Sequence, residues 1–306
     1  MEKQTQIVII GAGIAGLTAA IYLKRSNVDF VILDKGAPGG KLNNIHKIEN
    51  YSGFMPISGP ELAQNLLKQT QSLGISVDYG NVTGIKKTAK GYSIFADEDE
   101  FQCKGIILAA GMSNRKEYVP GEKEFLGRGV SYCATCDGNF FKGKTVAVVG
   151  YEDHAVEDVI YLAGLAQKVY FFLPQEMQTV ETHHQALMNL KNVEIHIHAP
   201  LLSVSGARLV ESVKVLEEGK EIAYEVNGVF PLYGEVPSTA FASSLGLKSD
   251  KQFICVNENM ETSLPGVFAC GDIVSKKLRQ LVTAASDGAI AATSAISFLY
   301  SKSCTF

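Results

Sequence analysis

Two cysteines three positions apart are the residues of this sequence best suited to redox chemistry. Cys133 and Cys136 stand in SYCATCDGNFF (131–141), and Asp137 follows directly. At this spacing near a helix start, two thiols can form a reversible disulfide, and at least one of them has a lowered pKa. A zinc site needs four ligands, and no second CxxC or HxxxH pattern occurs. Two inert buried cysteines are the other alternative, but the polar flanking residues argue against it. We therefore expect a redox pair and no metal.

A glycine loop near the N-terminus has the pattern of a dinucleotide site. Gly11, Gly13 and Gly16 follow an expected strand at 5–10 and open an expected helix at 14–25. They permit a tight turn, close approach to a pyrophosphate, and close helix packing, respectively. Asp34 ends the next expected strand, where an acid accepts a ribose hydroxyl. The loop favours dinucleotide binding over an empty close-packed turn, but does not separate NAD from FAD.

A second strand, glycine and helix occur at GYEDHAVED (150–158), after the apolar run TVAVV. This loop has one glycine, followed by Glu152 and Asp153. Acids at a helix N-terminus complement its dipole, but they also repel a diphosphate. One like-charge pair at about 4 Å costs roughly 4 kcal/mol at an effective dielectric constant of about 20. The sequence alone leaves open whether this site is disabled or never bound a nucleotide.

The composition is that of a soluble globular protein of about two domains. The chain has 306 residues, 46% hydrophobic content and a net charge of −4, so nothing favours a nucleic-acid or membrane partner. No apolar run reaches the ~18 residues of a membrane span. The N-terminus has the pattern of a first strand and not of a signal peptide. We expect a cytoplasmic protein.

Hydrophobic patterning predicts an α/β fold with two Rossmann-like three-layer nucleotide-binding domains, the second inserted into the first. We expect residues 1–113 and 236–306 to form the first domain and 114–235 the second. The other main expected elements are a helix at 57–74 capped by Ser58, strands at 105–109, 144–150, 168–173 and 192–199, a hairpin region at 212–230, a strand ending in Gly-Asp at 266–273 and a helix at 279–300.

Nearly the whole chain resembles the low-molecular-weight thioredoxin reductases, which are flavoprotein disulfide reductases with two dinucleotide folds. The matching pieces are GAGIAGLTAA (11–20), PGGKL with IENYSGF (38–54), ILAAG (107–111), CATCDG (133–138), VFACGDI (267–273) and RQLVTAASDG (279–288). CATCDG ahead of a second nucleotide unit is highly specific for this family.

The resemblance implies that the first domain binds FAD. Lys41 stands where the family usually has glutamine, so its contact is expected to differ. The implied FAD residues are Gly11, Gly13, Ile14, Ala15, Asp34, Gly39, Gly40, Lys41, Leu42, Asn50, Val82, Ala110, Gly111, Gly271, Asp272, Arg279, Gln280 and Leu281. Without the resemblance, Asp272 could be a plain helix cap and Arg279 a solvated surface charge.

The same resemblance implies roles for the catalytic residues. Cys136 is expected to face the flavin and receive its electrons, and Cys133 to attack the disulfide of thioredoxin or a thioredoxin-like protein. Asp137 is expected to act as general acid for the departing thiolate. Thiolate attack on a disulfide proceeds through a mixed disulfide, which the second cysteine resolves. A homodimer is also implied.

The sequence departs from the family in its second nucleotide loop. Glu152 replaces the glycine at which the backbone approaches phosphate, and Leu173-Pro174-Gln175 aligns with the family's basic cluster. No Lys or Arg occurs between Val169 and Leu190, so a 2′-phosphate lacks a guanidinium partner. We therefore expect FAD without NADPH.

Reduced ferredoxin is the electron donor that we favour, since a few relatives that lack the nucleotide motifs are reduced by it. Ferredoxins are acidic, so a basic docking patch would help. Its candidates are Lys41, Lys47, Lys276, Lys277 and Arg279, although clustered cations are commonly just solvated surface. Phe306 beside Cys304 is a candidate cover for the flavin face. A frayed chain end is the simpler interpretation.

Three other functions stay open at this point. The first is an NAD(P)H-dependent thioredoxin reductase with an unusual nucleotide pocket. The second is a flavin thiol oxidase that passes electrons to oxygen. The third is a flavin-loaded redox sensor or binding scaffold without turnover.

Overall fold

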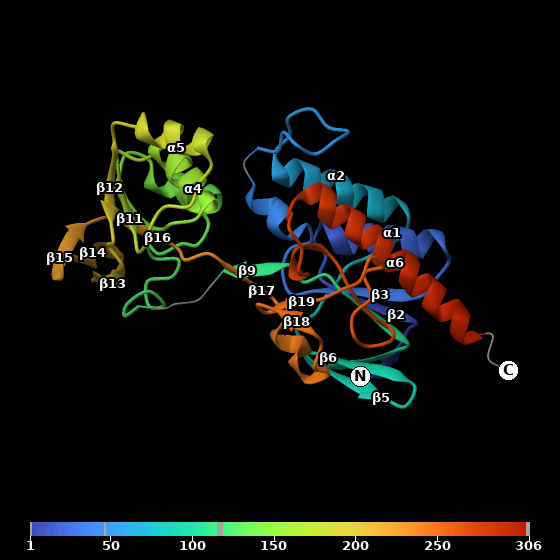
Figure 1. Ribbon diagram of the computed structural model, residues 1–306. Coiled ribbons are helices and arrows are strands. Elements are labelled where there is room, and N and C mark those ends of the chain that lie inside the picture. The colour runs from blue at the N-terminus through green and yellow to red at the C-terminus, as the bar shows by residue number, and fades with distance from the viewer. Residues whose placement is uncertain (1, 46, 115–118, 304–306) are drawn as a thin grey trace. The chain divides into compact units, whose positions relative to one another are not determined.

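The computed structural model describes residues 2–45, 47–114 and 119–303 (Figure 1). Cys304 and Phe306 lie outside the described residues. The chain divides into two compact units, Met1–Ser113 with Pro237–Phe306, and Asn114–Val236. A two-stranded ribbon of β9 (Met112–Asn114) and β17 (Glu235–Pro237) forms where the chain passes between the units. What each unit binds stays a prediction.

The first unit is built on a five-stranded parallel sheet in the order β20-β8-β2-β3-β4. These strands are β2 (Ile7–Ile10), β3 (Phe30–Asp34), β4 (Asp78–Tyr79), β8 (Gly105–Leu108) and β20 (Val267–Ala269). β2, β8 and β20 are fully buried along their length. Both of their faces must therefore be covered, which explains their continuous apolar runs.

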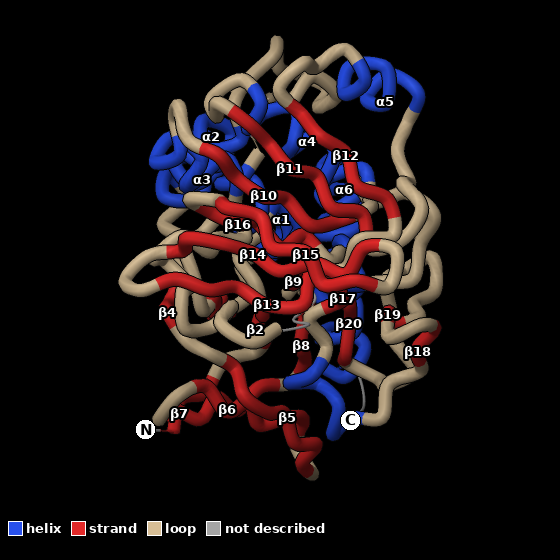
Figure 2. The backbone as a smooth tube through the Cα atoms, turned by 90° about the vertical axis from the view of Figure 1, so that its left-hand side faces the viewer, coloured by secondary structure: helices blue, strands red, loops and turns tan. Residues whose placement is uncertain are grey.

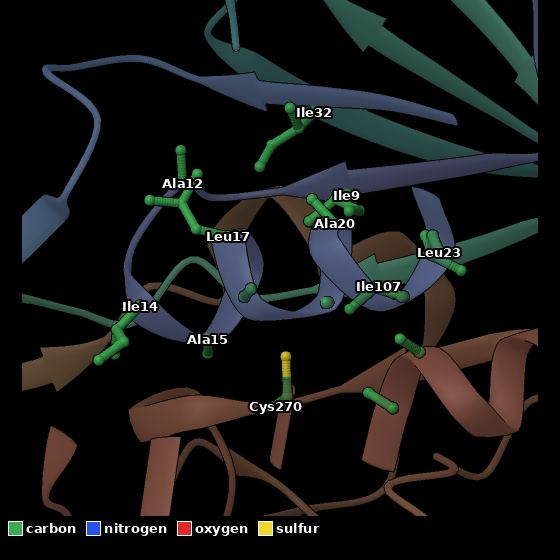
Figure 3. Close-up of a cluster of buried hydrophobic side chains, with 14 of the residues drawn as sticks. Ile9, Ala12, Ile14, Ala15, Leu17, Ala20, Leu23, Ile32, Ile107 and Cys270 are labelled. Atoms are coloured by element: carbon green, nitrogen blue, oxygen red, sulfur yellow. The ribbon is translucent and has the colours of Figure 1, made fainter. Parts of the chain in front are cut away.

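Helices cover one face of this sheet. They are α1 (Ile14–Arg25), α2 (Gly59–Ser72) and α6 (Leu281–Ser303), which lie together in Figure 1. Figure 3 shows Ile9 and Ile107 of the sheet beside Leu17, Ala20 and Leu23 of α1. Ser58 caps α2 as expected, because its side chain accepts a hydrogen bond from the Glu61 amide. The short 3₁₀ segment η1 (Gly40–Asn44) lies before α2.

A mixed sheet in the order β1-β7-β6-β5 belongs to the core on the other face. β1 pairs parallel with β7, and the other neighbouring strands pair antiparallel. Its strands are β1 (Glu2–Gln4), β5 (Val82–Thr88), β6 (Gly91–Ala96) and β7 (Asp99–Cys103). Val8 and Ile10 of β2 pack in this core, whereas Ile7 and Ile9 pack in the helical one. This alternation within one strand produces the three layers. The remaining short elements are η3 (Ala240–Leu245), β18 (Ser249–Asp250), β19 (Phe253–Ile254) and η4 (Gly271–Ile273).

The segment Leu281–Ser301 of α6 is, by length and composition, apolar enough to cross a membrane. This result differs from the expectation that no segment of the chain reaches that length. Its packing accounts for the composition, because Ala284, Ala291, Ala292 and Ala295 are buried in the core shared with α1. At Gly288 an added Cβ would lie 2.1 Å from the Ala15 carbonyl oxygen. Small residues in α6 thus allow two backbones to approach each other.

The second unit repeats the three layers. Its parallel sheet has the order β12-β11-β10-β16, and Figure 2 shows these strands side by side. They are β10 (Thr145–Gly150), β11 (Lys168–Leu173), β12 (Val193–Ile197) and β16 (Gly228–Leu232). One face packs in a core with α4 (Asp153–Ala163) and α5 (Glu181–Met188). The other packs in a core with β13 (Leu201–Gly206) and β14 (Val210–Glu217).

The expected hairpin at 212–230 is right only in its first part. β14 pairs antiparallel with β15 (Lys220–Glu225). Residues 228–232 instead form β16, which pairs parallel with β10. The actual partner of β16 lies about 80 residues earlier, which local sequence patterns do not reveal.

Asp158 in α4 provides a test of the second unit's stability. Burial, together with the Glu157 carboxylate, raises the pKa of Asp158 to about 7. The folded protein thus holds this proton up to neutral pH, whereas the unfolded chain releases it near pH 4. Stability is therefore lost as the pH rises between these values. For Asp158→Asn we expect a free energy of unfolding roughly 1–3 kcal/mol above wild type at pH 8.

Urea denaturation at pH 8 and pH 4 measures this difference, which should vanish at pH 4. Glu157→Gln is the neighbouring control, and its gain should be smaller. A lower stability of Asp158→Asn at pH 8 would contradict the prediction.

Candidate functional site

The cysteine pair lies at the start of a short helix in the second unit. Cys133 and Cys136 form a disulfide, with their Cα atoms 5.3 Å apart. Cys133 is the N-cap of α3 (Ala134–Asp137), and its sulfur accepts a hydrogen bond of 3.2 Å from the Cys136 amide. Cys136 is exposed and Cys133 is half-buried. The arrangement is that of a redox disulfide, as expected, and not of a zinc site.

The sheet and α4 hold this disulfide in place. The Ser131 amide donates to the Val229 carbonyl of β16 over 3.1 Å, which ties the chain before Cys133 to the sheet. On the other side, Gly138 at the start of η2 (Gly138–Phe141) packs against α4. A Cβ added at Gly138 would lie 3.0 Å from the Tyr161 ring. The rigid sheet therefore sets the position of a four-residue helix that is too short to be stable alone.

Ser131 connects the predicted general acid to the disulfide. Its hydroxyl donates to Asp137 Oδ2 over 2.6 Å and accepts from the Cys133 amide over 3.1 Å. One buried hydroxyl thus fixes both Asp137 and the backbone of Cys133. The sequence analysis did not identify Ser131. A serine immediately before a CxxC motif is an ordinary residue, and only the fold reveals its two hydrogen bonds.

In the first unit, Asp34 organises the glycine loop. Its Oδ2 accepts from the Ala12 amide over 2.6 Å, and its Oδ1 accepts from the Gly36 amide over 2.8 Å. The Gly39 amide donates to the Ala12 carbonyl over 2.8 Å. The sequence therefore places Asp34 at the correct strand end. Each carboxylate oxygen keeps a second lone pair for a ribose hydroxyl.

The three loop glycines differ in what surrounds them. A Cβ at Gly11 would lie 2.3 Å from the Ala109 oxygen, and one at Gly16 would lie 1.8 Å from the Gly11 oxygen. At Gly13 no atom lies within 4 Å of such a Cβ. Gly13 is the N-cap of α1 and has no side-chain capping bond. Gly11 and Gly16 are required by packing, whereas Gly13 leaves open space at a helix N-terminus, which suits a pyrophosphate.

The Gly-Asp motif supplies an independent test of fit to a cofactor. The buried Oδ1 of Asp272 has no hydrogen-bond partner among the described residues. Such an atom is costly unless a ligand donates to it. The side chain of Asn50 donates to that of Gln280 over 3.0 Å, which joins two implied FAD residues across 230 positions. These features fit a flavin nucleotide that donates hydroxyl groups.

The other implied FAD residues occupy the same unit. Val82 lies near Asp34, because the amide of Gly80, two residues earlier, donates to the Asp34 carbonyl over 2.9 Å. The Leu42 side chain is buried in the helical core. It therefore offers only its backbone. Ile14 and Ala15 begin α1, Gly40 and Lys41 begin η1, Ala110 and Gly111 follow β8, and Leu281 begins α6.

Two members of the expected basic docking patch have partners within the protein. Lys276 Nζ lies 2.7 Å from Asp287 Oδ2, and the Lys276 side chain is only 16% exposed. Arg279 donates to the carbonyls of Asp272 and Val274 and lies 3.8 Å from the centre of the Phe253 ring. Lys47 is exposed and pairs with Glu49. Lys276 and Arg279 therefore both have partners within the protein. Asp287 and Phe253 are more than ten positions away in sequence, whereas Asp272 and Val274 lie within a few residues of Arg279.

The second glycine loop carries two acids that have separate structural roles. Glu152 lies over Gly234, where an added Cβ would be 2.8 Å from Glu152 Oε1. Asp153 Oδ1 accepts from Thr179, from the Val180 amide at 3.1 Å, and lies 2.9 Å from His183 Nδ1. Partial burial opposes ionisation of Asp153, but these hydrogen bonds outweigh it and lower the pKa. The two acids thus fill and brace the end of the sheet where a diphosphate would sit.

Asp153, Glu157 and His183 also form a group of possible metal ligands, with ligand atoms within 4.8 Å of one another. The hydrogen bonds of Asp153 to α5 and to the loop before it account for this grouping. We therefore assign no metal ion to this group of residues.

Comparisons with known proteins agree with the geometry of the site. Residues 5–288 match the model of the pyridine nucleotide-disulphide oxidoreductase family. Thioredoxin reductase of Bacillus subtilis strain 168 is 39% identical over 303 residues, covering 96% of this chain and 94% of that protein. The solved thioredoxin reductase of Lactococcus lactis in its FR conformation is 36% identical, with a TM-score of 0.90, covering 97% of this chain and 99% of that one. A ferredoxin-flavin thioredoxin reductase of Clostridium acetobutylicum is 33% identical, with a TM-score of 0.56, covering 98% and 100%.

The surroundings of the loop glycines predict that two similar substitutions affect different properties, FAD binding in one case and the stability of the fold in the other. Gly13→Ala places its Cβ in open space, so the apoprotein should fold with wild-type stability. FAD binding should weaken by roughly tenfold or more, because the methyl group occupies the approach of a pyrophosphate. Gly16→Ala places its Cβ against the Gly11 carbonyl and should destabilise the fold itself by roughly 1–3 kcal/mol.

Flavin absorbance per protein and thermal unfolding of the apoprotein separate the two effects. Full FAD content in Gly13→Ala would refute this assignment of the loop.

Proposed function

Since the chain belongs to the pyridine nucleotide-disulphide oxidoreductase family, we propose that it is an FAD-dependent thioredoxin-disulfide reductase. The observation that carries the proposal is the Cys133–Cys136 disulfide, held at the start of α3 beside Asp137. The names of similar proteins support the same substrate class, thioredoxin or a thioredoxin-like protein. A homodimer stays an expectation.

The two cysteines divide the reaction between them. In the reduced pair, the Cys133 thiolate attacks one sulfur of the substrate disulfide, and the other substrate sulfur leaves as a thiolate. Asp137, held by Ser131, is proposed to protonate that leaving group. Cys136 then attacks Cys133, which re-forms the disulfide and releases the second substrate thiol. The pair loses two electrons and the substrate gains them.

FAD is proposed to bind in the first unit, at the Gly11–Gly16 loop, Asp34 and Asp272. The open space at Gly13 and the unpartnered Asp272 Oδ1 support this placement. When bound, FAD supplies one- and two-electron chemistry that couples an electron donor to a disulfide. The chain's own residues hold the cofactor's phosphates with the α1 N-terminus and its hydroxyl groups with carboxylates.

The proposed electron donor is reduced ferredoxin in place of NADPH. Glu152 brings a negative charge to the place of a diphosphate, and Asp153 adds another. The described residues from Val169 to Leu190 contain no Lys or Arg that could bind a 2′-phosphate. The similarity to a ferredoxin-flavin thioredoxin reductase supports the alternative donor. Lys276 and Arg279 do not add to this support, because they have internal partners.

An NAD(P)H-dependent reductase is the second candidate. The description of the matching family names a pyridine nucleotide, and this observation favours such a donor. The two candidates share the flavin and the cysteine pair, so only the source of electrons distinguishes them.

Anaerobic mixing of the holoprotein with possible donors decides between them. Excess NADPH or NADH should leave the flavin absorbance unchanged over minutes, whereas reduced ferredoxin should bleach it and support reduction of thioredoxin. Dithionite is the positive control for a reducible flavin. Rapid bleaching by NADPH would exclude the ferredoxin proposal in favour of the second candidate. Hydrogen peroxide formed from a dithiol in air would indicate a thiol oxidase.

The roles of the two cysteines are tested by a matched pair of variants. In Cys136→Ser, Cys133 can attack thioredoxin but the mixed disulfide cannot be resolved, so a covalent complex should accumulate. In Cys133→Ser no such complex should form, although Cys136 is the more exposed residue. Non-reducing gel electrophoresis after mixing with oxidised thioredoxin measures both. A complex with Cys133→Ser alone would reverse the assignment.

A further inference from the structure

A partly buried lysine lies between two carboxylates beside the proposed flavin site. Lys276 Nζ lies 2.7 Å from Asp287 Oδ2 and 3.9 Å from Asp272 Oδ1. The side chains of Lys276 and Asp287 are 16% and 11% exposed. Asp287 Oδ2 also accepts from the Gly271 amide over 3.1 Å. One ammonium thus lies within reach of a carboxylate from α6 and of the carboxylate in the Gly-Asp motif.

The two carboxylates are not equivalent. Asp287 has a hydrogen bond from Lys276 and one from a backbone amide, so its Oδ2 is satisfied. Asp272 Oδ1 is buried and accepts no hydrogen bond among the described residues. The 3.9 Å distance to Lys276 is too long for one, but the attraction between the charges persists. Lys276 therefore attracts the Asp272 carboxylate and leaves its Oδ1 free to accept a hydrogen bond.

Without the ammonium, the same geometry would be unfavourable. Two carboxylates would share a buried site near Gly271, and like charges at short range in a poorly solvated region repel strongly. The Asp272 carboxylate would then turn away from Asp287, which removes the oriented acceptor. Lys276 thus influences the orientation of Asp272 in addition to forming its own ion pair with Asp287.

We propose that Lys276 is a positioning residue of the flavin site, whose ammonium, anchored by Asp287, orients the Asp272 carboxylate to accept a hydrogen bond from a hydroxyl of FAD. This inference rests on the proposed binding of FAD. It assigns to Lys276 and Asp287 a function that the motif residues alone do not reveal. A purely structural ion pair between α6 and the preceding loop is the competing explanation.

Four variants separate positioning from stability. Lys276→Met removes the charge, Lys276→Arg keeps it, and Lys277→Met is the matched control on the exposed neighbouring residue. The double variant Lys276→Met/Asp287→Leu removes both partners of the buried pair, so that no unpaired charge destabilises the fold. The Kd for FAD is measured by titrating apoprotein and following flavin fluorescence, and thermal unfolding of each apoprotein is measured separately.

Lys276→Met should raise the Kd for FAD by about tenfold, the loss of one oriented hydrogen bond. The double variant has no Asp287 charge to repel Asp272, but it also lacks the ammonium that orients the Asp272 carboxylate, so its Kd should rise by about tenfold as well. Lys276→Arg and Lys277→Met should stay within about twofold of wild type. If Lys276→Met fails to fold, the double variant alone decides. A double variant that binds FAD like wild type would overturn the positioning role and leave only the structural one. A wild-type protein that takes up no FAD would overturn the proposed function, and this inference with it.

Discussion

The close approach of three backbone segments is the constraint on which the first unit depends. The end of β2, the start of α1 and the second turn of α6 meet with no room for side chains at Gly16 and Gly288. Because α6 lies so close to α1, Asp287 reaches the amide of Gly271. A Cβ added at Gly271 would lie only 3.0 Å from the Cβ of Ala15. The packing of glycines thus gathers the nucleotide loop, the Gly-Asp motif and Lys276 into one small region.

The second unit has the same layers but uses its helix N-terminus differently. In the first unit, Gly13 leaves the N-terminus of α1 open, and Asp34 braces the loop from the neighbouring strand. In the second, Asp153 in the first turn of α4 accepts hydrogen bonds from the loop that follows β11. A carboxylate of the chain satisfies the helix dipole that a phosphate would otherwise satisfy.

Local patterns predicted the parts of this protein that depend on neighbours in sequence. The helix at Ile14, the strand at Lys168–Leu173 and the Ser58 cap follow from glycine, apolar runs and capping residues. The position of β16 did not follow, because its parallel partner is distant. Charges were the least predictable feature. Lys276 and Arg279 were candidates for a docking patch, and Arg279 was also an implied FAD residue, but nothing near them in sequence indicates Asp287 or Phe253 as partners. An acid in an otherwise small and apolar helix, such as Asp287, is the one signal that could have indicated a buried ion pair.

The sulfur of Cys133 is both half of a disulfide and the cap of the helix that carries the other half. Reduction breaks the bond between the two sulfurs. A Cys133 thiolate can still keep the hydrogen bond from the Cys136 amide, since thiolates at helix starts are stabilised by such donors. The backbone of α3 is also held by Ser131 and by Gly138, neither of which changes with oxidation state. We therefore expect the backbone around α3 to stay in place when the disulfide is reduced, so that electron transfer at this site requires little local reorganisation of the chain.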